Sequence, residues 1–281
     1  MSEPAGGAAP PLPPGTKPVA GYEVLAHLTR TGWLDVYDAW SDERDCRCVL
    51  KTVRADLREE ERLVRRLLRE GRWLREFTHP HLVRAYETFE SPEPLVVLET
   101  LTGEMLSHLV DRLRHRAAAA DVALLGVQLC SAVHYLHGRG LLHLDVKPAN
   151  VVVDRGHAKL LDLSLARPPG PAPAGLGTYG YLAPEQVSGG ALTAAADVWG
   201  IGATLFDVAT GGPPFDGPGT RPRPVRSAPP VGRSRRRLPA ALAAAVDACL
   251  RTDAASRPTV AELSTALEAT LPVPQRQAPG P

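Results

Sequence analysis

Short runs of β-branched and apolar residues, separated by turn residues, mark the N-terminal third of the chain. The runs fall at 22–28, 35–40, 46–53, 82–89 and 95–100. Thr31-Gly32 and Ser41-Asp42 lie between the first three runs, and residues of these types between strand-like runs indicate turns. Residues 58–75 precede the fourth run and are charged on most faces of a helix. This region is therefore predicted to be a small sheet with one helix.

The pattern becomes helical after about residue 101. Apolar residues recur at helical spacing and mark one buried face: Leu125, Leu129, Val133 and Leu136. Gly138 and Gly140 follow this face as stop signals. Further helices are predicted at 194–210 and 238–250, and short extended pieces at 151–153 and 158–161. Thr259-Val260-Ala261-Glu262 has the form of a capping box, which opens the last helix.

The two ends of the chain have a different composition. Residues 1–20 are rich in proline, glycine and alanine and are expected to be disordered, as is the tail at 272–281. The chain has 281 residues, which suits either one large domain or one domain of two lobes. Its formal net charge of +1 gives no global field that would favour nucleic acid or a membrane surface. No apolar run is expected to reach the roughly 18 residues of a membrane-spanning helix, and no signal peptide opens the chain.

Cysteine and lysine are both scarce. The four cysteines are Cys46, Cys48, Cys130 and Cys249. Their spacing is not that of a metal site, and we interpret them as reduced thiols of a cytoplasmic protein. Lysine occurs only at Lys17, Lys51, Lys147 and Lys159, although arginine is abundant. A planar guanidinium replaces a compact ammonium group poorly, so Lys51 and Lys147 are candidates for a role that requires an ammonium group.

The segment with the most chemical information is His143-Leu144-Asp145-Val146-Lys147-Pro148-Ala149-Asn150, followed by Asp162. The Asp145 carboxylate can orient a hydroxyl nucleophile, and Lys147 can neutralise charge on a phosphoryl group in transfer. Asn150 and Asp162 offer oxygen ligands suited to Mg²⁺, a hard cation. Phosphoryl transfer needs little more than positioning and charge neutralisation. The segment therefore predicts a phosphoryl-transfer site.

This segment resembles the catalytic loop H-R-D-L-x-x-x-N of eukaryotic-type serine/threonine protein kinases, including those of bacteria, with Asp162 in the place of the D-F-G aspartate. The resemblance implies an α+β, bilobal protein-kinase-like fold with a small β-rich N-lobe and a larger helical C-lobe. We expect the N-lobe at 21–101 and the C-lobe at 102–271. The implied activity is transfer of the ATP γ-phosphoryl group to protein hydroxyls, with ATP and Mg²⁺ as cofactors and a protein as substrate.

Other motifs follow in the order that the family requires. Lys51 ends a strand-like run and resembles the lysine that holds the α- and β-phosphates, and Glu70 resembles the glutamate that pairs with it. Asp145 and Lys147 complete the expected catalytic set. The implied structural and regulatory residues are His143, Leu144, Thr178, Glu185 of the A-P-E element, Asp197 at the start of a buried helix, and Arg257. The implied nucleotide contacts are Leu28, Val36, Val49, Lys51, Glu99, Leu101 and Val152.

Three departures from the family pattern are visible. The glycine-rich loop G-x-G-x-x-G-x-V reads Thr29-Arg30-Thr31-Gly32-Trp33-Leu34-Asp35-Val36, so that all three glycines are replaced. Glycine there allows backbone N–H groups to approach phosphates closely, and its loss predicts weaker ATP binding. The D-F-G element is Asp162-Leu163-Ser164, and the arginine before the catalytic aspartate is Leu144 (a non-RD type).

These losses leave alternatives open. A pseudokinase that acts as a scaffold or allosteric partner would explain the altered loop, but it would not require the whole polar set. A small-molecule phosphotransferase of the aminoglycoside or choline type shares H-x-D-x-x-x-x-N, but not the motifs around Lys147, Glu185 and Arg257. Lys147 and Thr178 favour serine and threonine over tyrosine as acceptors.

Two weaker features have two interpretations each. Residues 217–237 are rich in arginine and proline and contain no acidic residue. They are either a solvated loop or, from Arg221 to Arg237, a docking strip for an acidic partner. Trp33 either covers the nucleotide or is an exposed loop aromatic.

Overall fold

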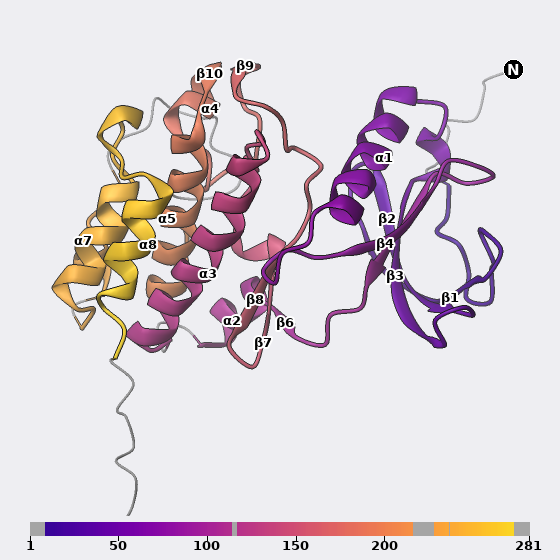
Figure 1. Ribbon diagram of the computed structural model, residues 1–281, viewed down its shortest axis with the longest axis horizontal. Coiled ribbons are helices and arrows are strands. Elements are labelled where there is room, and N and C mark those ends of the chain that lie inside the picture. Colours follow the sequence, from indigo (N-terminus) through magenta and orange to yellow (C-terminus); the bar gives the residue numbers. More distant parts are fainter. Residues whose placement is uncertain (1–8, 114–116, 216–227, 236, 273–281) are drawn as a thin grey trace, which may run out of the picture. The chain divides into compact units, whose positions relative to one another are not determined.

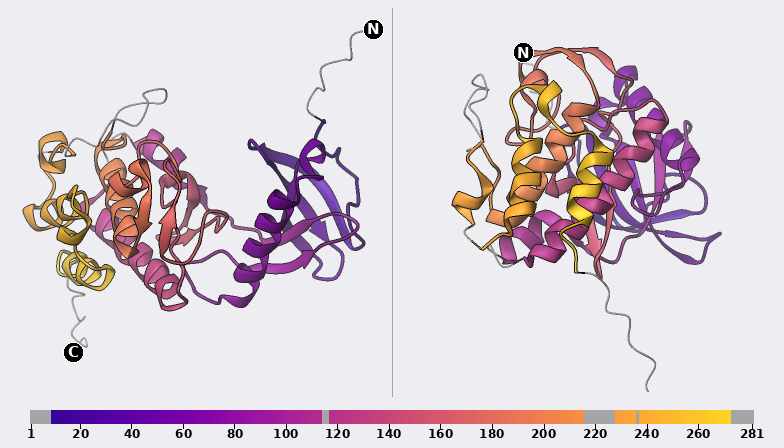
Figure 2. Two further views of the ribbon diagram at one scale, coloured as in Figure 1. Left: turned by 90° about the horizontal axis from the view of Figure 1, so that it is seen from above. Right: turned by 60° about the vertical axis from the view of Figure 1, so that its left-hand side comes forward.

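A computed structural model of the chain describes residues 9–113, 117–215, 228–235 and 237–272 (Figures 1 and 2). The chain forms two compact units. The first unit comprises the residues up to Thr102 together with Asp162–Ser164, and the second comprises Gly103–Leu161 and the residues from Leu165 onward. Each unit is described by itself below.

The first unit is an antiparallel five-stranded sheet with one long helix (Figure 1). Its strands are β1 (Tyr22–Arg30), β2 (Leu34–Ser41), β3 (Cys46–Val53), β4 (Ala85–Phe89) and β5 (Leu95–Glu99). They are arranged in the order β1-β2-β3-β5-β4. The 3₁₀ turn η1 (Ala55–Leu57) leads into helix α1 (Glu61–Glu76). The strands and the helix expected from the hydrophobic pattern are therefore present.

The two faces of this sheet have different roles. One face holds the hydrophobic core, to which β2 and β3 contribute alternate residues such as Tyr37 and Leu50. The other face carries Lys51, since side chains alternate along a strand. Helix α1 packs on this second face, where Gly71 comes so close to β5 that a Cβ atom would lie 2.6 Å from the side chain of Val96. The sheet thus presents Lys51 to α1.

The segment before β1 covers the first face. The N–H of Leu12 donates to the Tyr37 hydroxyl at 2.9 Å, and the N–H of Val24 donates to the Thr16 carbonyl at 2.9 Å. Val19 is buried against the same core. The expectation of disorder is therefore wrong for residues 9–20, while residues 1–8 and 273–281 lie outside the described part of the chain.

The second unit is mainly helical. Its helices are α2 (Leu106–Leu113), α3 (Ala119–Gly138), α4 (Pro184–Ser188), α5 (Ala194–Thr210), α6 (Val231–Ser234), α7 (Ala240–Cys249) and α8 (Val260–Glu268). Its short strands are β6 (Glu104–Met105), β7 (Val151–Asp154), β8 (His157–Leu160), β9 (Gly170–Ala172) and β10 (Gly190–Leu192). The 3₁₀ turns are η2 (Pro148–Asn150) and η3 (Ala254–Ser256). The predicted capping box opens α8, because the Thr259 hydroxyl accepts from the Glu262 N–H and the Glu262 carboxylate accepts from the Thr259 N–H.

Helices α3, α5 and α8 pack together at the centre of this unit (Figure 1). At Gly126 of α3, an added Cβ atom would lie 2.5 Å from Leu267 of α8 and 2.9 Å from Leu205 of α5. By length and composition alone, α3 would suffice to span a membrane, which corrects the expectation that no segment reaches that length. Half of its most apolar window is buried inside the protein, as in the core helix of a folded domain.

The cysteines form no disulfide. Burial raises the pKa of Cys48 and of Cys130 to about 12, so both remain protonated thiols at neutral pH. Of the arginine-rich segment, residues 216–227 and 236 lie outside the described part of the chain. The side chain of Arg235 turns inward and donates to the Ala209 carbonyl at 3.0 Å, which removes this arginine from the expected docking strip.

Candidate active site

The loop that carries Asp145 is fixed by the first turn of α5. The N–H groups of His143 and Leu144 donate to the two carboxylate oxygens of Asp197, at 2.9 and 2.7 Å. Asp197 is 1% exposed, and Nε2 of His137 lies 2.8 Å from Oδ2 of the same carboxylate. The Asp197 carboxylate thus holds the backbone directly before Asp145, with Leu144 in the left-handed region at φ 66°.

His143 aligns the same loop from the other side. The N–H of Asp145 donates to Nδ1 of His143 at 3.2 Å, so that Nδ1 is the acceptor nitrogen. Nε2 therefore carries the proton and donates to the Leu161 carbonyl at 3.0 Å. His143 is fully buried, and it links the loop to the end of the segment that leads to Asp162.

The carboxylate of Asp145 is surrounded by donors. Oδ1 accepts from the Thr178 hydroxyl at 2.7 Å, and Oδ2 accepts from the Lys147 ammonium group at 2.7 Å. Nδ2 of Asn150 donates to the Asp145 carbonyl at 2.8 Å and to Oδ2 at 3.0 Å. The second unit therefore brings together four of the polar residues that the sequence predicted. The hydrogen bonds of Asn150 also fix its amide, which assigns the nitrogen to Asp145 and leaves Oδ1 as the atom that could reach a cation.

A second anchor reaches this loop through α4. Both oxygens of Glu185 accept from the guanidinium of Arg257, at 2.7 and 2.9 Å. The next residue, Gln186, donates from Nε2 to the carbonyls of Leu144 and Leu176, at 2.9 and 2.8 Å. Helix α4 thereby connects the catalytic loop to the segment that carries Thr178.

The first unit gathers the remaining charged residues. The Lys51 ammonium group donates to Oε1 of Glu70 at 2.8 Å and lies 3.4 Å from Oδ1 of Asp162. Asp162 adopts a left-handed backbone conformation with φ 57°, and its Oδ1 accepts from the N–H of Ser164 at 2.9 Å. Burial favours a neutral lysine, but the two carboxylates outweigh it and raise the pKa of Lys51. Lys51 is therefore a cation fixed between Glu70 and Asp162.

The burial of the Glu70 carboxyl group lowers the stability of the folded chain. Glu70 is 1% exposed, and its Oε2 has no hydrogen-bond partner among the described residues. Burial raises the pKa of Glu70 to about 7, against the pull of Lys51. In the unfolded chain the Glu70 carboxyl group would lose its proton at a lower pH. The contribution of Glu70 to the free energy of unfolding therefore decreases as the pH rises to 7 and is least favourable above pH 7. A buried, half-satisfied ion pair is poor evidence for a stabilising role and points instead to function.

A tight hairpin stands in place of the glycine-rich loop. The N–H of Thr31 donates to the Leu34 carbonyl at 2.9 Å, and Oγ1 of Thr31 accepts from the N–H groups of Leu34 at 3.0 Å and Trp33 at 3.4 Å. Arg30 and Asp35 pair across its base. Although burial acts in the opposite direction, hydrogen bonds from Arg30 and His27 hold the pKa of Asp35 below its ordinary value. The hairpin thus uses internally the N–H groups that a glycine-rich loop would offer to phosphate.

Replacing Thr31 by glycine is expected to lower the KM for ATP by about threefold, because it removes the side-chain acceptor from two backbone N–H groups. Thr31→Ser keeps the hydroxyl and is the matched control, with an unchanged KM. Leu34 is a poor site for a restored glycine, since it is 2% exposed and belongs to the core. Steady-state kinetics at varied ATP measure the effect. A higher KM in Thr31→Gly would show that the threonine-capped hairpin is the form that binds nucleotide.

The expected nucleotide contacts are divided between the two units. Val36, Val49 and Lys51 share one face of the first sheet, because Val36 pairs with Lys51 and Val49 precedes Lys51 by two residues. Leu28 is 55% exposed on β1, and Leu101 follows β5. Val152 belongs to β7 of the second unit. The Glu99 side chain is already engaged, since its carboxylate accepts from the Arg84 N–H at 2.9 Å.

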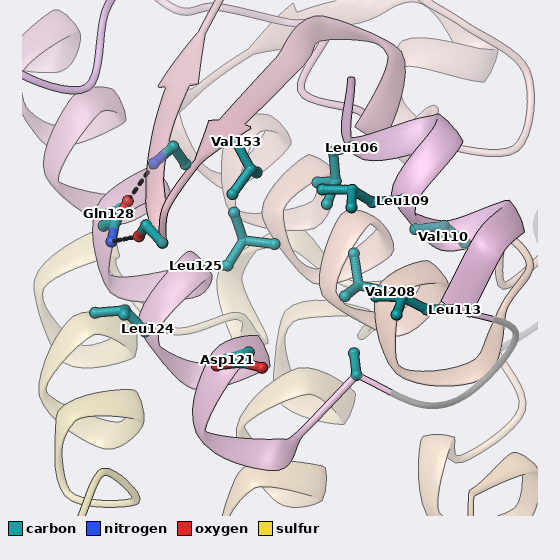
Figure 3. A pocket seen from close by; sticks show the side chains of 13 residues that line it. Leu106, Leu109, Val110, Leu113, Asp121, Leu124, Leu125, Gln128, Val153 and Val208 are labelled. Carbon is teal, nitrogen blue, oxygen red and sulfur yellow. Dashed lines mark hydrogen bonds between the residues drawn. The ribbon is translucent and has the colours of Figure 1, made fainter. Parts of the chain in front are cut away.

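Two sizeable cavities lie among the described residues of the second unit. One, of about 330 Å³, is lined in part by Lys147, Thr178, Tyr181 and Asp207. The other, of about 270 Å³, is apolar and lies between α2, α3 and β7 (Figure 3). Leu106, Leu109, Leu125 and Val153 point into it, and Gln128 donates to the Gly156 carbonyl at its edge (Figure 3). The first of these two touches residues of the predicted site, whereas the described residues that line the second include none of them.

Three residues that take part in this arrangement were not predicted from the sequence. Gln186 follows the A-P-E element directly, and nothing in its identity indicated its hydrogen bonds to the catalytic loop. His137 precedes the stop signal at Gly138, and nothing in the sequence indicated its contact with Asp197. Arg66 lies four residues before Glu70, on the same face of a helix, but its partners Trp33 and Ser164 are distant in the sequence.

The comparison with protein families agrees with this geometry. Residues 22–266 match the family model described as the protein kinase domain. The chain belongs to the protein kinase family, as the sequence predicted. Its curated relatives include bacterial serine/threonine-protein kinases. The DNA damage-responsive serine/threonine-protein kinase RqkA of Deinococcus radiodurans is 34% identical over 74% of this chain and 32% of its own length. The serine/threonine-protein kinase PknB of Mycobacterium tuberculosis is 32% identical over 60% of this chain and 29% of its own length.

Solved structures show the same fold. A crystal structure of the PknI kinase domain of Mycobacterium tuberculosis matches with a TM-score of 0.75 and 25% sequence identity, and covers 92% of this chain and 98% of that chain. The expected protein-kinase fold is therefore confirmed. This chain spans about a third of the length of the curated relatives described above.

Proposed function

We propose that the chain is an active protein kinase that transfers the γ-phosphoryl group of ATP to serine or threonine hydroxyls of proteins. The observation that carries this proposal is the Asp145 carboxylate, which is held by Thr178, Lys147 and Asn150 within the second unit. The position is that of a base that accepts the proton of an attacking hydroxyl. The cavity beside Lys147 and Thr178, of about 330 Å³, offers space for the acceptor side chain.

The other residues have roles that follow from their charges. The Lys51 ammonium group, held by Glu70, would bind the α- and β-phosphates. Lys147 would neutralise charge on the transferred group, and its contact with both Asp145 and Thr178 positions it for this role. Leu28, Val36, Val49, Leu101 and Val152 would contact the adenosine part of ATP.

The residues present fit a magnesium ion. No cluster of three or more histidine, cysteine, aspartate or glutamate side chains suited to a metal occurs within the described ranges. Mg²⁺ needs no such cluster, because one or two carboxylates together with substrate phosphates and water suffice. Asp162 offers its carboxylate, and Asn150 its amide oxygen, since the amide nitrogen is bound to Asp145. Mg²⁺, when bound, would offset the charge of the phosphates.

The main competing proposal is a pseudokinase that acts as a scaffold. The internally bonded hairpin favours it, because its N–H groups are not offered to phosphate. The buried Lys51–Glu70 pair argues against it, since a scaffold would gain nothing from a carboxylate with an unsatisfied oxygen. Incubation of the purified protein with radiolabelled ATP, Mg²⁺ and a generic basic protein distinguishes the two. Label in the acceptor supports the kinase, and nucleotide binding without transfer supports the scaffold.

Activity is expected to be independent of phosphorylation in the activation segment. No serine, threonine or tyrosine occurs between Ser164 and Thr178, and the residue before Asp145 is the buried Leu144 instead of an arginine that could bind a phosphate. Backbone hydrogen bonds hold the segment instead, because Leu142 and Arg167 pair in both directions at 2.8 and 3.1 Å. Strands β9 and β10 pair as well.

A phosphatase treatment followed by the transfer assay tests this expectation. The treated and untreated proteins should have equal rates. A large fall in rate, traced by mass spectrometry to a phosphosite between Asp162 and Glu185, would contradict it.

Two broader expectations belong to this proposal. A cytoplasmic location is proposed because the four cysteines are free thiols. An acidic partner remains proposed for the other arginines of the Arg221–Arg237 segment. Arg233 and Arg237 are exposed, and the arginines up to Arg226 together with Arg236 lie outside the described residues.

A further inference from the structure

One arginine of α1 contacts two of the three segments in which the chain departs from the family pattern. Nε of Arg66 donates to the Ser164 carbonyl at 2.8 Å, and Nη2 donates to the Ser164 hydroxyl at 3.1 Å. The guanidinium carbon of Arg66 also lies 4.5 Å from the centre of the Trp33 ring, at the tip of the hairpin. Arg66, Trp33 and Ser164 all belong to the first unit.

These contacts complete a ring of interactions around the charged site. Ser164 donates from its N–H to Asp162, and Asp162 lies 3.4 Å from the Lys51 ammonium group. Lys51 donates to Glu70, which lies one helical turn after Arg66 on the same face of α1. Arg66 then donates back to Ser164. A shift of any member therefore disturbs the metal-binding candidate Asp162.

Arg66 binds Ser164, which is itself a departure from the family pattern, and Trp33, which lies in the altered loop. Ser164 replaces the D-F-G glycine, and a glycine would offer the carbonyl but no hydroxyl. Trp33 offers a ring face at the tip of a hairpin that has lost the family's glycines. The tip is also held from the end of β3, since the Arg54 N–H donates to the Trp33 carbonyl at 3.0 Å. Arg66 thus connects the altered phosphate loop to the segment of Asp162.

We propose that Arg66 is a positioning residue for phosphoryl transfer. Its side chain fixes the positions of the hairpin tip and of the Asp162–Ser164 segment relative to Glu70. This inference rests on the proposed kinase function. Family members with a glycine-rich loop fold a flexible loop over the phosphates. In this chain the hairpin is stiffer, and the contact of Arg66 with Trp33 fixes its position. The nucleotide therefore binds to a hairpin that is already in place. Preformed contacts lower the entropy lost on binding.

The arrangement requires an arginine. A guanidinium stacks on the indole with its planar face while its edge donates two hydrogen bonds to Ser164. A lysine keeps the charge but cannot do both. Arg66→Lys is therefore expected to raise the KM for ATP about fivefold, the scale of one stacking or charged hydrogen-bond contact. The KM for the acceptor protein should not change.

The split between kinetic constants separates positioning from general structural damage. A variant with fewer folded molecules has a lower kcat but an unchanged KM for ATP. Trp33→Ala should raise the KM for ATP as Arg66→Lys does. Trp33→Phe should restore most of the affinity for ATP, because it keeps a ring face. The double variant Trp33→Ala/Arg66→Lys should have a KM for ATP little higher than that of either single variant. Arg69→Lys is the matched control, since Arg69 stacks on Trp73 of the same helix at 5.1 Å and contributes nothing to the ring of interactions. It should leave both constants unchanged.

Hydrogen exchange by mass spectrometry makes the test independent of activity. In nucleotide-free protein, peptides that cover residues 29–36 and 160–166 should exchange faster in Arg66→Lys than in the wild type, and equally in Arg69→Lys. If the wild type transfers no phosphoryl group, the proposed function fails, and this exchange measurement still decides whether Arg66 holds the two segments. Equal exchange in Arg66→Lys and wild type overturns the inference. So does an active wild type whose KM for ATP is unchanged in both Arg66→Lys and Trp33→Ala.

Discussion

Replacing Asp145 by asparagine is expected to reduce the rate of phosphoryl transfer by at least about 10²-fold, the usual scale for a positioned acid or base. The physical reason lies in the donors around the carboxylate. Oδ1 accepts from Thr178, and Oδ2 accepts from both Lys147 and Asn150. An asparagine can satisfy the Thr178 hydroxyl with its oxygen, but its amide nitrogen then faces the Lys147 ammonium group, donor against donor. The variant loses the proton acceptor and also disturbs the residue that neutralises the transferred group.

The measurement is the initial rate of label transfer from ATP to a basic acceptor protein. Asp121→Asn is a suitable control, because Asp121 is an exposed carboxylate of α3 in the same unit. It should retain full activity. The affinity of Asp145→Asn for a non-hydrolysable ATP analogue should stay close to that of the wild type, since Lys51 and Glu70 are untouched. Full transfer activity in Asp145→Asn would refute the assignment of the base.

The polar site was predictable because its residues occur in fixed local spacing. Asp145, Lys147 and Asn150 lie within one short segment, 145–150. The backbone geometry of so short a segment allows few arrangements of their side chains. The partners Lys51 and Glu70 are 19 residues apart, and a strand followed by a helix brings them together. Here the family resemblance, rather than the spacing, made the pairing predictable.

The N-terminal segment was not predictable from composition. Proline, glycine and alanine dominate residues 9–20, and these residues provide little apolar surface of their own. Two apolar side chains, Leu12 and Val19, nevertheless pack against the sheet core, and the Tyr37 hydroxyl accepts from the Leu12 N–H. The order of this segment depends on the open face of a sheet formed elsewhere in the chain, which no local pattern records.

Arg66 shows a similar limit for the site. The helix that contains it is charged on most faces. Nine of its sixteen residues, from Glu61 to Glu76, are arginine or glutamate, so one arginine does not stand out by its identity. Its contacts are with Trp33 and Ser164, which lie 33 and 98 residues away in sequence. Only the folded first unit shows that the replaced glycines and this arginine belong to one arrangement.

Loss of the Arg257 side chain is expected to destabilise the second unit by about 3–5 kcal/mol, the cost of leaving one member of a buried ion pair without its partner. The Arg257 side chain is fully buried and donates to both oxygens of Glu185. It also donates to the carbonyls of Ala195 and Arg251, each at 2.8 Å. Its guanidinium lies 4.8 Å from the centre of the Trp199 ring. Arg257→Met removes all of these contacts and strands the Glu185 carboxylate.

The measurement is the urea midpoint of unfolding, with Arg112→Met as the matched control. Arg112 pairs with Glu104 at 2.9 Å in the same unit, but its side chain is 61% exposed, and such surface pairs contribute roughly 0–1 kcal/mol. The double variant Glu185→Leu/Arg257→Met should be more stable than Arg257→Met, because it leaves no buried carboxylate alone. Equal midpoints for Arg257→Met and Arg112→Met would contradict the prediction. The effect should also reach the active site, because Gln186, next to Glu185, holds the Leu144 carbonyl directly before Asp145.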